Sequence, residues 1–428
     1  MTSSSKRLKI AIIGAGPAGC TLARLLIHND VLAEVTIFEG DKSIDARSQG
    51  GSLDLHKESG LEAMKRCGLY EEYLKYARFD GEAFTVANKD LKKLICMAGT
   101  DEKSSRGRPE IDRVRLREIL VDSLAEGVIR WGWHLKSVVE VGDGSFNLLF
   151  RDQGLESGFD LVVGAEGAWS KVRAFLSDDR PYFFGVSGVS LSISDPQNRC
   201  PDLYKLVNRG SMFAFSDAKS IMVQQLGDGS LSVGTWGAHA EDYIQKFDDK
   251  AQADTETIKA LLRKEYEGWN PLLLQIFEMA DGPVVPRNLH MLPIGTKWKH
   301  RPGITMIGDA AHLMGPFAGE GVNLAMSDAM SLAITISNAS KPSLDVDTKS
   351  LFSTAIRAFE EDMFKRATKV QQMSYDMMEA MFMTPGAPNH TIEKWLLTAA
   401  GKDMNFILKG LLAVAVYTYF FFWRCWNL

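Results

Sequence analysis

A glycine-rich segment near the N-terminus constrains the fold of this 428-residue chain more than any other feature. Residues 14–19 read Gly-Ala-Gly-Pro-Ala-Gly, after an apolar run over 9–13 and before an apolar stretch over 20–28. A second apolar run over 34–38 ends at Glu39. This order predicts a strand, a tight turn, a helix and a second strand parallel to the first. We therefore expect an α/β fold that begins with a Rossmann-type unit.

The spacing of these glycines predicts a dinucleotide site. Gly14 permits the tight turn, Gly16 lets the backbone approach a pyrophosphate, and Gly19 allows the helix to pack closely on the strand. Ala18 lies in the first turn of that helix, whose N–H groups face the phosphates. Glu39 ends the second strand, where its carboxylate can accept both ribose hydroxyls. An acid there disfavours a 2′-phosphate, so the pattern favours FAD or NAD over NADP in this pocket.

A second glycine motif indicates which dinucleotide binds. Residues 308–312 read Gly-Asp-Ala-Ala-His and residues 316–323 read Pro-Phe-Ala-Gly-Glu-Gly-Val-Asn, after an apolar run over 304–307. Asp309 is placed to bind a ribityl hydroxyl. The N–H groups around Gly319, Gly321 and Val322 form the positive end of a helix, which stabilises negative charge on a reduced flavin. The two motifs together predict FAD.

Both motifs resemble those of the group A flavoprotein monooxygenases, the para-hydroxybenzoate hydroxylase class. Residues 161–167, Leu-Val-Val-Gly-Ala-Glu-Gly, followed by Ser170 and Arg173, resemble the middle fingerprint of that class, which touches both FAD and the pyridine nucleotide. Glu166 stands where the class usually has Asp. The resemblance implies a Rossmann-type FAD domain interleaved with an antiparallel-sheet substrate domain, α+β overall, followed by C-terminal helices.

Residues 45–47, 50–57, 107–113 and 116–117 bring a closer likeness, to the tetracycline-inactivating monooxygenases of the TetX type. It covers most of the chain from residue 9 to about residue 383. This resemblance implies that Asp54, Arg113 and Arg117 bind FAD. It also makes Arg47 a candidate contact to NADPH, with a structural salt bridge as the alternative.

The reaction follows from the same resemblance. NAD(P)H, as NADPH or NADH, reduces FAD, and O2 forms a C4a-hydroperoxyflavin that transfers one oxygen atom. Hydroxylation, epoxidation and Baeyer–Villiger insertion all use this intermediate. Ser190, Phe213 and Phe317 are candidate substrate-binding residues of an apolar, partly aromatic pocket, which departs from the tetracycline enzymes. We expect a small aromatic, phenolic or polyketide-like substrate, as in secondary metabolite biosynthesis, and assign no catalytic acid or base.

Three other functions remain open on the sequence. A flavin oxidase or dehydrogenase binds the same cofactor without transferring oxygen. A flavin halogenase is disfavoured, because Leu135-Lys136 follows Trp131-Gly132-Trp133 where halogenases have Ile-Pro. The third is a non-catalytic FAD-binding protein tethered to a membrane.

The expected domains are interleaved along the chain. Residues 1–70, 101–180 and 287–345 form the FAD-binding domain, and residues 71–100 and 181–286 form the substrate-binding sheet domain. Residues 346–400 form a C-terminal helical segment, and residues 404–428 form an apolar tail. The alternation of apolar and polar residues in the second domain predicts antiparallel strands, such as one over 231–236.

The tail allows two interpretations. Residues 410–423 are apolar between Lys409 and Arg424, which is shorter than the roughly 20 residues that span a bilayer. Tyr417, Tyr419 and Trp423 suit a membrane interface. The tail therefore contacts a membrane or forms a last helix packed on the body.

Composition narrows the remaining classes. The net charge is −5 with no basic stripe, which argues against nucleic-acid binding. The five cysteines are scattered and never in CxxC spacing, and the histidines lack metal-ligand spacing, so we expect neither disulfides nor a metal. The N-terminal apolar run is too short for a signal peptide. A cytoplasmic protein, with membrane association through its C-terminus and no evident protein partner, fits these features.

Overall fold

The N-terminal glycine motif lies at the carboxyl end of a parallel sheet. The structure is a computed structural model that describes residues 7–46, 50–99, 107–141, 145–248, 255–340, 348–401 and 404–427. Its first sheet has five strands in the order β17 (Ile304–Met306), β11 (Leu161–Gly164), β1 (Leu8–Ile13), β2 (Ala33–Glu39) and β7 (Ile129–Trp131). All four neighbouring pairs are parallel. The predicted α/β unit is therefore confirmed.

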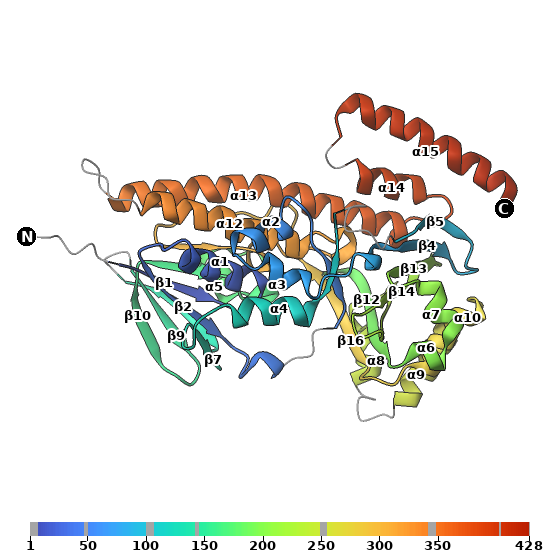
Figure 1. The fold of residues 1–428 in the computed structure, drawn as a ribbon, viewed down its shortest axis with the longest axis horizontal. Coiled ribbons are helices and arrows are strands. Elements are labelled where there is room, and N and C mark those ends of the chain that lie inside the picture. The colour runs from blue at the N-terminus through green and yellow to red at the C-terminus, as the bar shows by residue number, and fades with distance from the viewer. Residues whose placement is uncertain are drawn as a thin grey trace, which may run out of the picture.

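Long helices cover this sheet (Figure 1). Helix α1 (Pro17–His28) packs on α12 (Gly321–Ala339), and α12 packs on the long helix α13 (Thr348–Met378). Ile10, Ala11 and Ile12 of β1 are fully buried in the resulting core. Helix α4 (Arg113–Asp122) contacts α1. These helices share one apolar core with the parallel strands and leave the strand ends to form a site.

A small antiparallel sheet joins the FAD-binding region. It consists of β8 (Leu135–Glu140), β9 (Phe146–Phe150) and β10 (Leu155–Phe159). Phe150 packs on Phe38 of β2 with ring centroids 4.7 Å apart and on Trp133 at 5.0 Å. Trp133 therefore packs in this aromatic cluster, and it also lines the cavity described below.

A second, larger sheet follows in space. It has seven strands in the order β16 (Val285–Met291), β12 (Tyr182–Ile193), β15 (Leu231–Ala238), β14 (Lys219–Gln225), β13 (Ser211–Ser216), β4 (Phe84–Asn88) and β5 (Lys93–Met97). Only the β13–β4 pair is parallel among its described pairs. The expected boundary at residue 286 runs through β16. Strands β3 (Ser52–Asp54) and β6 (Glu110–Asp112) pair with each other in a two-stranded antiparallel sheet of their own.

The two faces of the large sheet have different neighbours because side chains alternate along each strand. Met212 and Ala214 of β13 pack with α7 (Pro201–Val207), α9 (Thr255–Glu265) and α10 (Pro271–Met279) in one apolar cluster. Phe213 and Phe215 belong to another cluster, with residues of α13 and of the C-terminal helices. This second face borders the cavity described below.

Three C-terminal segments complete the fold. Helix α13 continues into a π-helical turn, Glu379–Met383. Helix α14 (Ile392–Ala400) packs on α13, and α15 (Phe406–Asn427) packs on α14 at the edge of the molecule (Figure 1). The shorter helices are α2 (Gly60–Arg66), α3 (Tyr70–Leu74), α5 (Lys171–Leu176), α6 (Pro196–Arg199), α8 (Gln245–Asp248) and α11 (Asp309–His312).

Candidate functional site

One large cavity joins the ends of the parallel strands to the face of the seven-stranded sheet. Its volume is about 1650 Å³. Small-molecule sites usually measure about 300–1000 Å³. The cavity therefore has room for a dinucleotide and a second molecule.

The first glycine motif lines one part of the cavity. Gly14 has a φ of +106°, which favours glycine, and Gly16 caps the N-terminus of α1. No atom lies within 4 Å of a Cβ built on Gly16, so the backbone there is open to a ligand. A Cβ on Gly19 would lie 2.1 Å from the carbonyl oxygen of Gly14, which explains the missing side chain. Gly19 itself does not line the cavity, whereas Ala18 does.

Glu39 stands beside this loop at the end of β2. Its side chain is buried, and its Oε2 accepts a hydrogen bond of 2.6 Å from the backbone N–H of Ala15. Its Oε1 accepts one of 2.8 Å from the N–H of Asp41. Arg117 donates to Asp41 Oδ2 at 3.3 Å and to the carbonyl of Ile44 at 3.2 Å. Arg117 thus fixes the corner of the cavity in which the Glu39 carboxylate lies.

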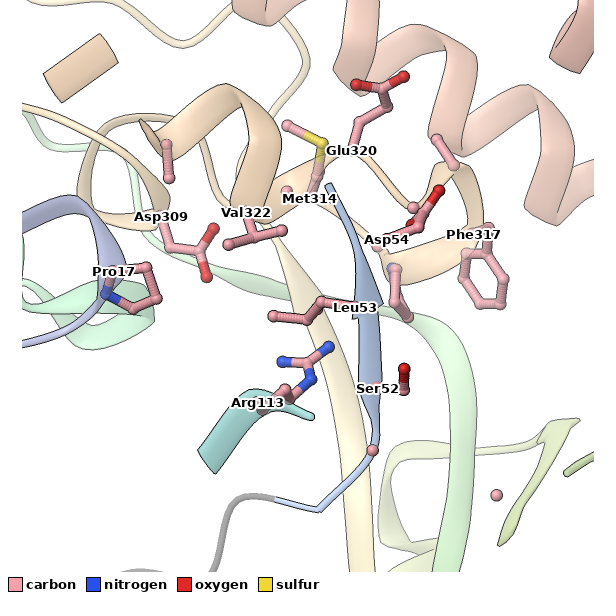
Figure 2. Close-up of a pocket in the computed structure, with 18 of the residues that line it drawn as sticks. Pro17, Ser52, Leu53, Asp54, Arg113, Asp309, Met314, Phe317, Glu320 and Val322 are labelled. Atoms are coloured by element: carbon pink, nitrogen blue, oxygen red, sulfur yellow. The ribbon is translucent and has the colours of Figure 1, made fainter. Parts of the chain in front are cut away.

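The second glycine motif lines the middle of the cavity, where Asp309, Gly319, Gly321 and Val322 all face the open space. Figure 2 shows Asp309, Val322 and Arg113 around the same opening. The side chain of Asp309 faces the open cavity, but the cavity itself lies inside the protein, so Asp309 is shielded from bulk water. This burial raises the pKa of Asp309, while the charges of His312 and Arg113 act in the opposite direction. Helix α12 begins in the same region, and the first N–H groups of a helix have no partner within that helix.

Arg173 and Glu166 hold the loops behind this motif. Arg173 is almost fully buried and donates to the carbonyls of Ala310, at 2.9 Å, and of Ala168. Glu166 Oε1 accepts hydrogen bonds from Ser170 Oγ at 2.8 Å and from the backbone N–H groups at the start of α5. Burial raises the pKa of Glu166 despite these bonds. The longer side chain at this position therefore caps α5 beside the cavity.

Sequence reasoning missed an acid–histidine–acid cluster at the flavin motif. His56 Nε2 lies 2.9 Å from Asp54 Oδ2, and His56 Nδ1 lies 3.4 Å from Glu320 Oε1. Burial disfavours the charged ring, but hydrogen bonds to the two carboxylates raise the pKa of His56. Asn323 donates to the carbonyl of Asp54 at 2.8 Å and so ties β3 to α12. Asp54 and Glu320 line the cavity, and His56 lies two residues beyond the end of β3. The sequence places Asp54 and His56 close together but gives no sign of the remote Glu320.

Glu110 is a second group that the sequence did not single out. It lines the cavity at β6 and accepts a hydrogen bond of 2.5 Å from Ser52 Oγ. Arg78 lies 3.3 Å from the same carboxylate oxygen. Burial raises the pKa of Glu110 to about 7, against the effects of Ser52 and Arg78.

The remaining part of the cavity is apolar along α13 and α14, whereas Gln224, Ser232 and Arg287 line it along the large sheet. Ser190, Phe213 and Phe317 line it, together with methionines of α13 and residues of α14. The rings of Phe317 and Phe382 lie 5.3 Å apart. Met373, Met377 and Met381 face the cavity as well as the core.

The structure brings together most of the residues that the sequence predicted. Asp54, Arg113 and Arg117 line the same cavity as the two glycine motifs and the three candidate substrate-binding residues. Arg47 lies outside the described residues. In the described part of the chain, no group of three or more metal-ligating side chains could hold a metal ion.

The lining fits FAD. The start of α1 with only small side chains beside Gly14 and Gly16, the carboxylate of Glu39 at the end of β2 and the N-terminus of α12 lie in one cavity, which are the features that bind the pyrophosphate, the ribose and the flavin of a dinucleotide. The site also leaves apolar space beyond the flavin motif for a substrate.

Comparison with known proteins agrees. The model of the FAD binding domain family matches residues 7–345. Monooxygenase penA of Penicillium thymicola is 30% identical over 90% of this chain and 98% of that protein. Monooxygenase asqM of Emericella nidulans is 28% identical over 86% of this chain and 94% of its own length.

The fold is shared with solved flavoproteins. A salicylate hydroxylase in complex with its substrate superposes with a TM-score of 0.72 at 19% identity, over 96% of this chain and 98% of that one. The tetracycline destructases Tet(51) and Tet(55) also share the fold. NAD(P)H is the typical electron donor of such monooxygenases. The chain belongs to the FAD binding domain family and is an FAD-dependent monooxygenase.

Proposed function

We propose that this monooxygenase uses NAD(P)H and O2 to hydroxylate or epoxidise a small aromatic, phenolic or polyketide-like substrate. The observation that carries the proposal is the apolar part of the cavity, which continues directly from the flavin motif. Phe213 and Phe317 supply aromatic faces there, and Ser190 supplies a hydroxyl. Flat aromatic ligands pack well on such faces, and single polar groups orient them.

The names of several relatives support an aromatic substrate. They include a salicylate hydroxylase of Pseudomonas putida and a 3-amino-4-hydroxybenzoate 2-monooxygenase of Streptomyces platensis. A zeaxanthin epoxidase is also related, which keeps epoxidation within the proposal. A ring that carries a hydroxyl group is electron-rich and can accept an oxygen atom.

Bound FAD would supply both the electrons and the activation of O2. We assign its binding to Gly14, Gly16, Ala18, Glu39, Asp54, Arg113, Arg117, Asp309, Gly319, Gly321 and Val322, with Gly19 acting through packing. The start of α12 would stabilise negative charge on a bound, reduced flavin, because its N–H groups are preorganised. The apolar wall excludes water from the reacting oxygen. Arg47 stays a candidate for NADPH.

Isotope labelling tests the proposed reaction. The purified yellow protein is supplied with NADPH and ¹⁸O2 and with a panel of phenols and aromatic polyketides. We expect one ¹⁸O atom in the product of at least one panel member. Product without label, formed while NADPH is consumed, would overturn the proposal in favour of an oxidase or dehydrogenase.

We also propose that α15 attaches a cytoplasmic protein to a membrane surface. Phe406–Trp426 is long and apolar enough to cross a membrane by length and composition. Phe406 is 90% exposed and Trp426 is 85% exposed. Placed at about 100° per residue, the exposed apolar side chains of α15 cover more than half of the helix circumference. A helix from a second copy of the chain would cover only a narrow stripe of the exposed apolar surface of α15, whereas lipid can cover all of that surface.

The other face of α15 is held by the body of the protein. Val416 and Phe420 are buried, and Arg424 forms an ion pair of 2.6 Å with Glu393 of α14. A helix held along its length in this way fits an interfacial anchor that lies in the membrane surface. Lys409 is exposed and can extend to the headgroups.

Vesicle sedimentation tests the anchor. The holoprotein should pellet with phosphatidylcholine vesicles, and a variant with Leu411→Ser, Phe421→Ser and Phe422→Ser should remain in the supernatant with its FAD bound. Wild-type protein that stays in the supernatant would contradict the anchor. A dimer that the triple substitution dissociates would identify a second copy as the partner of this face.

A further inference from the structure

The apolar part of the cavity reaches the surface at the end of α14. Its lining includes Leu396, Ala399 and Ala400 of this helix and Met404 of the segment that follows. Ala399, Ala400 and Met404 are exposed. This group of four residues, the α14 mouth, therefore belongs both to the cavity and to the surface of the protein.

Helix α14 also carries α15. Trp395 of α14 lines the cavity and shares an apolar cluster with Val416 and Phe420 of α15. At the end of α14, a Cβ on Gly401 would lie 3.4 Å from Cε of Lys409, so the start of α15 lies close to the α14 mouth. The opening is consequently beside the helix that we assign to the membrane surface.

The path from the mouth to the sheet is apolar. Trp395 stacks on Phe84 with ring centroids 6.3 Å apart, and Phe84 meets Phe213 edge-on at 5.1 Å. The lining residues on the α13 side of this path are Met373, Met377 and Met381. Unbranched methionine side chains adapt to irregular apolar ligands. Such a wall accommodates a hydrocarbon chain of the ligand better than it accommodates a polar group of the ligand.

We propose that the substrate is amphiphilic and enters from the bilayer through the α14 mouth. Its electron-rich ring lies near Phe213 and Phe317, and its hydrocarbon tail lies along Trp395 and the methionines toward Ala399. The inference rests on the proposed monooxygenase reaction and on the proposed membrane contact. It adds the substrate class and the route of entry.

Alkylphenols of different chain length test the tail site. Binding to the holoprotein is followed by the change in flavin absorbance, with phenol, para-butylphenol and para-octylphenol as probes. Each buried methylene contributes about 0.8 kcal/mol, or about fourfold in affinity. We therefore expect para-octylphenol to bind at least about tenfold more tightly than para-butylphenol. Equal affinities for the two alkylphenols would overturn the proposal.

Blocking the mouth locates the tail. Ala399→Trp or Ala400→Trp should remove the gain from the longer chain and leave the affinity for phenol unchanged. Ala415→Trp, on the exposed side of α15, is the matched control and should keep the gain. Melting temperature and FAD content show whether each variant folds. A gain from chain length that survives both substitutions on α14 would contradict the location.

Delivery from vesicles tests the route. Mixed with vesicles that carry para-octylphenol, the wild-type protein should show the flavin change faster than the triple serine variant of α15. Equal rates would overturn entry from the bilayer. The tail site is measured by binding alone, so its test does not depend on oxygen transfer. A failure of the membrane contact is detected by sedimentation. A failure of the proposed reaction is detected by isotope labelling.

Discussion

Glu39 brings a negative charge to the nucleotide site and is held in a fixed position there by hydrogen bonds. Its carboxylate accepts hydrogen bonds from the backbone N–H groups of Ala15, in the glycine loop, and of Asp41. The same oxygens are placed to accept the ribose hydroxyls of FAD, and hydrogen bonds to a charged acceptor are strong. Glu39→Gln should lower the affinity of the apoprotein for FAD by about tenfold to a hundredfold.

Fluorescence titration of the apoprotein with FAD measures this effect. Glu34→Gln, at an exposed position of the same strand, is the control and should leave the affinity unchanged. If both variants bind FAD as the wild type does, Glu39 has no role in holding the ribose.

Glu110 gives the stability of the protein a pH dependence of defined sign. Burial raises its pKa to about 7 in the folded chain, whereas an unfolded glutamate titrates near about 4.3. Between these values the folded state retains a proton that the unfolded state has lost. The contribution of this group to stability therefore declines as pH rises from about 4.3 to about 7, and stays constant above that range.

The groups that face Glu110 are Ser52, Arg78, Ser211 and Asp54. Glu110→Gln cannot ionise, so it should lose this part of the pH dependence. Urea unfolding at pH values across the window measures it, with Glu126→Gln at an exposed position as control. An unchanged slope in Glu110→Gln would mean that another group is responsible.

Single residues differ in how far the sequence reveals them. Gly14, Glu39 and Asp309 each follow a local spacing rule, because a neighbouring strand and the turn after it fix their positions. The cluster of Asp54, His56 and Glu320 joins residues that are far apart in the chain. No local pattern encodes such a contact, and it became visible only with the fold.

At the scale of elements, the packing of α1 on β1 separates folding from cofactor binding. Gly19→Ala places a Cβ 2.1 Å from the carbonyl oxygen of Gly14, so helix and loop must move apart. It should lower the free energy of unfolding by about 1–3 kcal/mol. Gly16→Ala meets no atom within 4 Å and should leave the apoprotein as stable as wild type. It should nevertheless weaken FAD binding, since the Cβ occupies the approach of the pyrophosphate.

Urea unfolding of the apoproteins and titration with FAD separate the two effects. The opposite pattern, with a destabilised Gly16→Ala and a stable Gly19→Ala, would be incompatible with the assigned roles of these glycines.

The lengths of elements were less predictable than their existence. The strands around residues 8–13, 33–39 and 304–306 appear within two residues of the apolar runs, because buried parallel strands are continuously apolar. The tail shows fourteen apolar residues between two cations, yet α15 extends over Phe406–Asn427. Arg424 forms an ion pair with Glu393 of α14, and this partner cannot be read from the tail itself.

At the scale of the whole molecule, the cavity depends on how the two sheets are arranged. The parallel pairing of β4 with β13 brings the segment around Phe84 to the same wall as Phe213. Met373 and Met377 of α13 and Met381 of the following π-helical turn reach this wall, and α13 also packs on α12 beside the FAD motifs. The sequence predicted the chemistry of the flavin through its motifs, but the shape of the substrate space arises from these long-range contacts. The interleaved domain boundaries remain a prediction.

Oxygen uptake by the purified yellow protein with NADPH, with hydrogen peroxide counted in parallel, tests the central claim most directly. The assay is run with and without each member of the phenol and polyketide panel. We predict that a substrate stimulates O2 uptake while little peroxide is released. Uptake matched by an equal amount of peroxide under every condition would contradict oxygen transfer to this class of substrate.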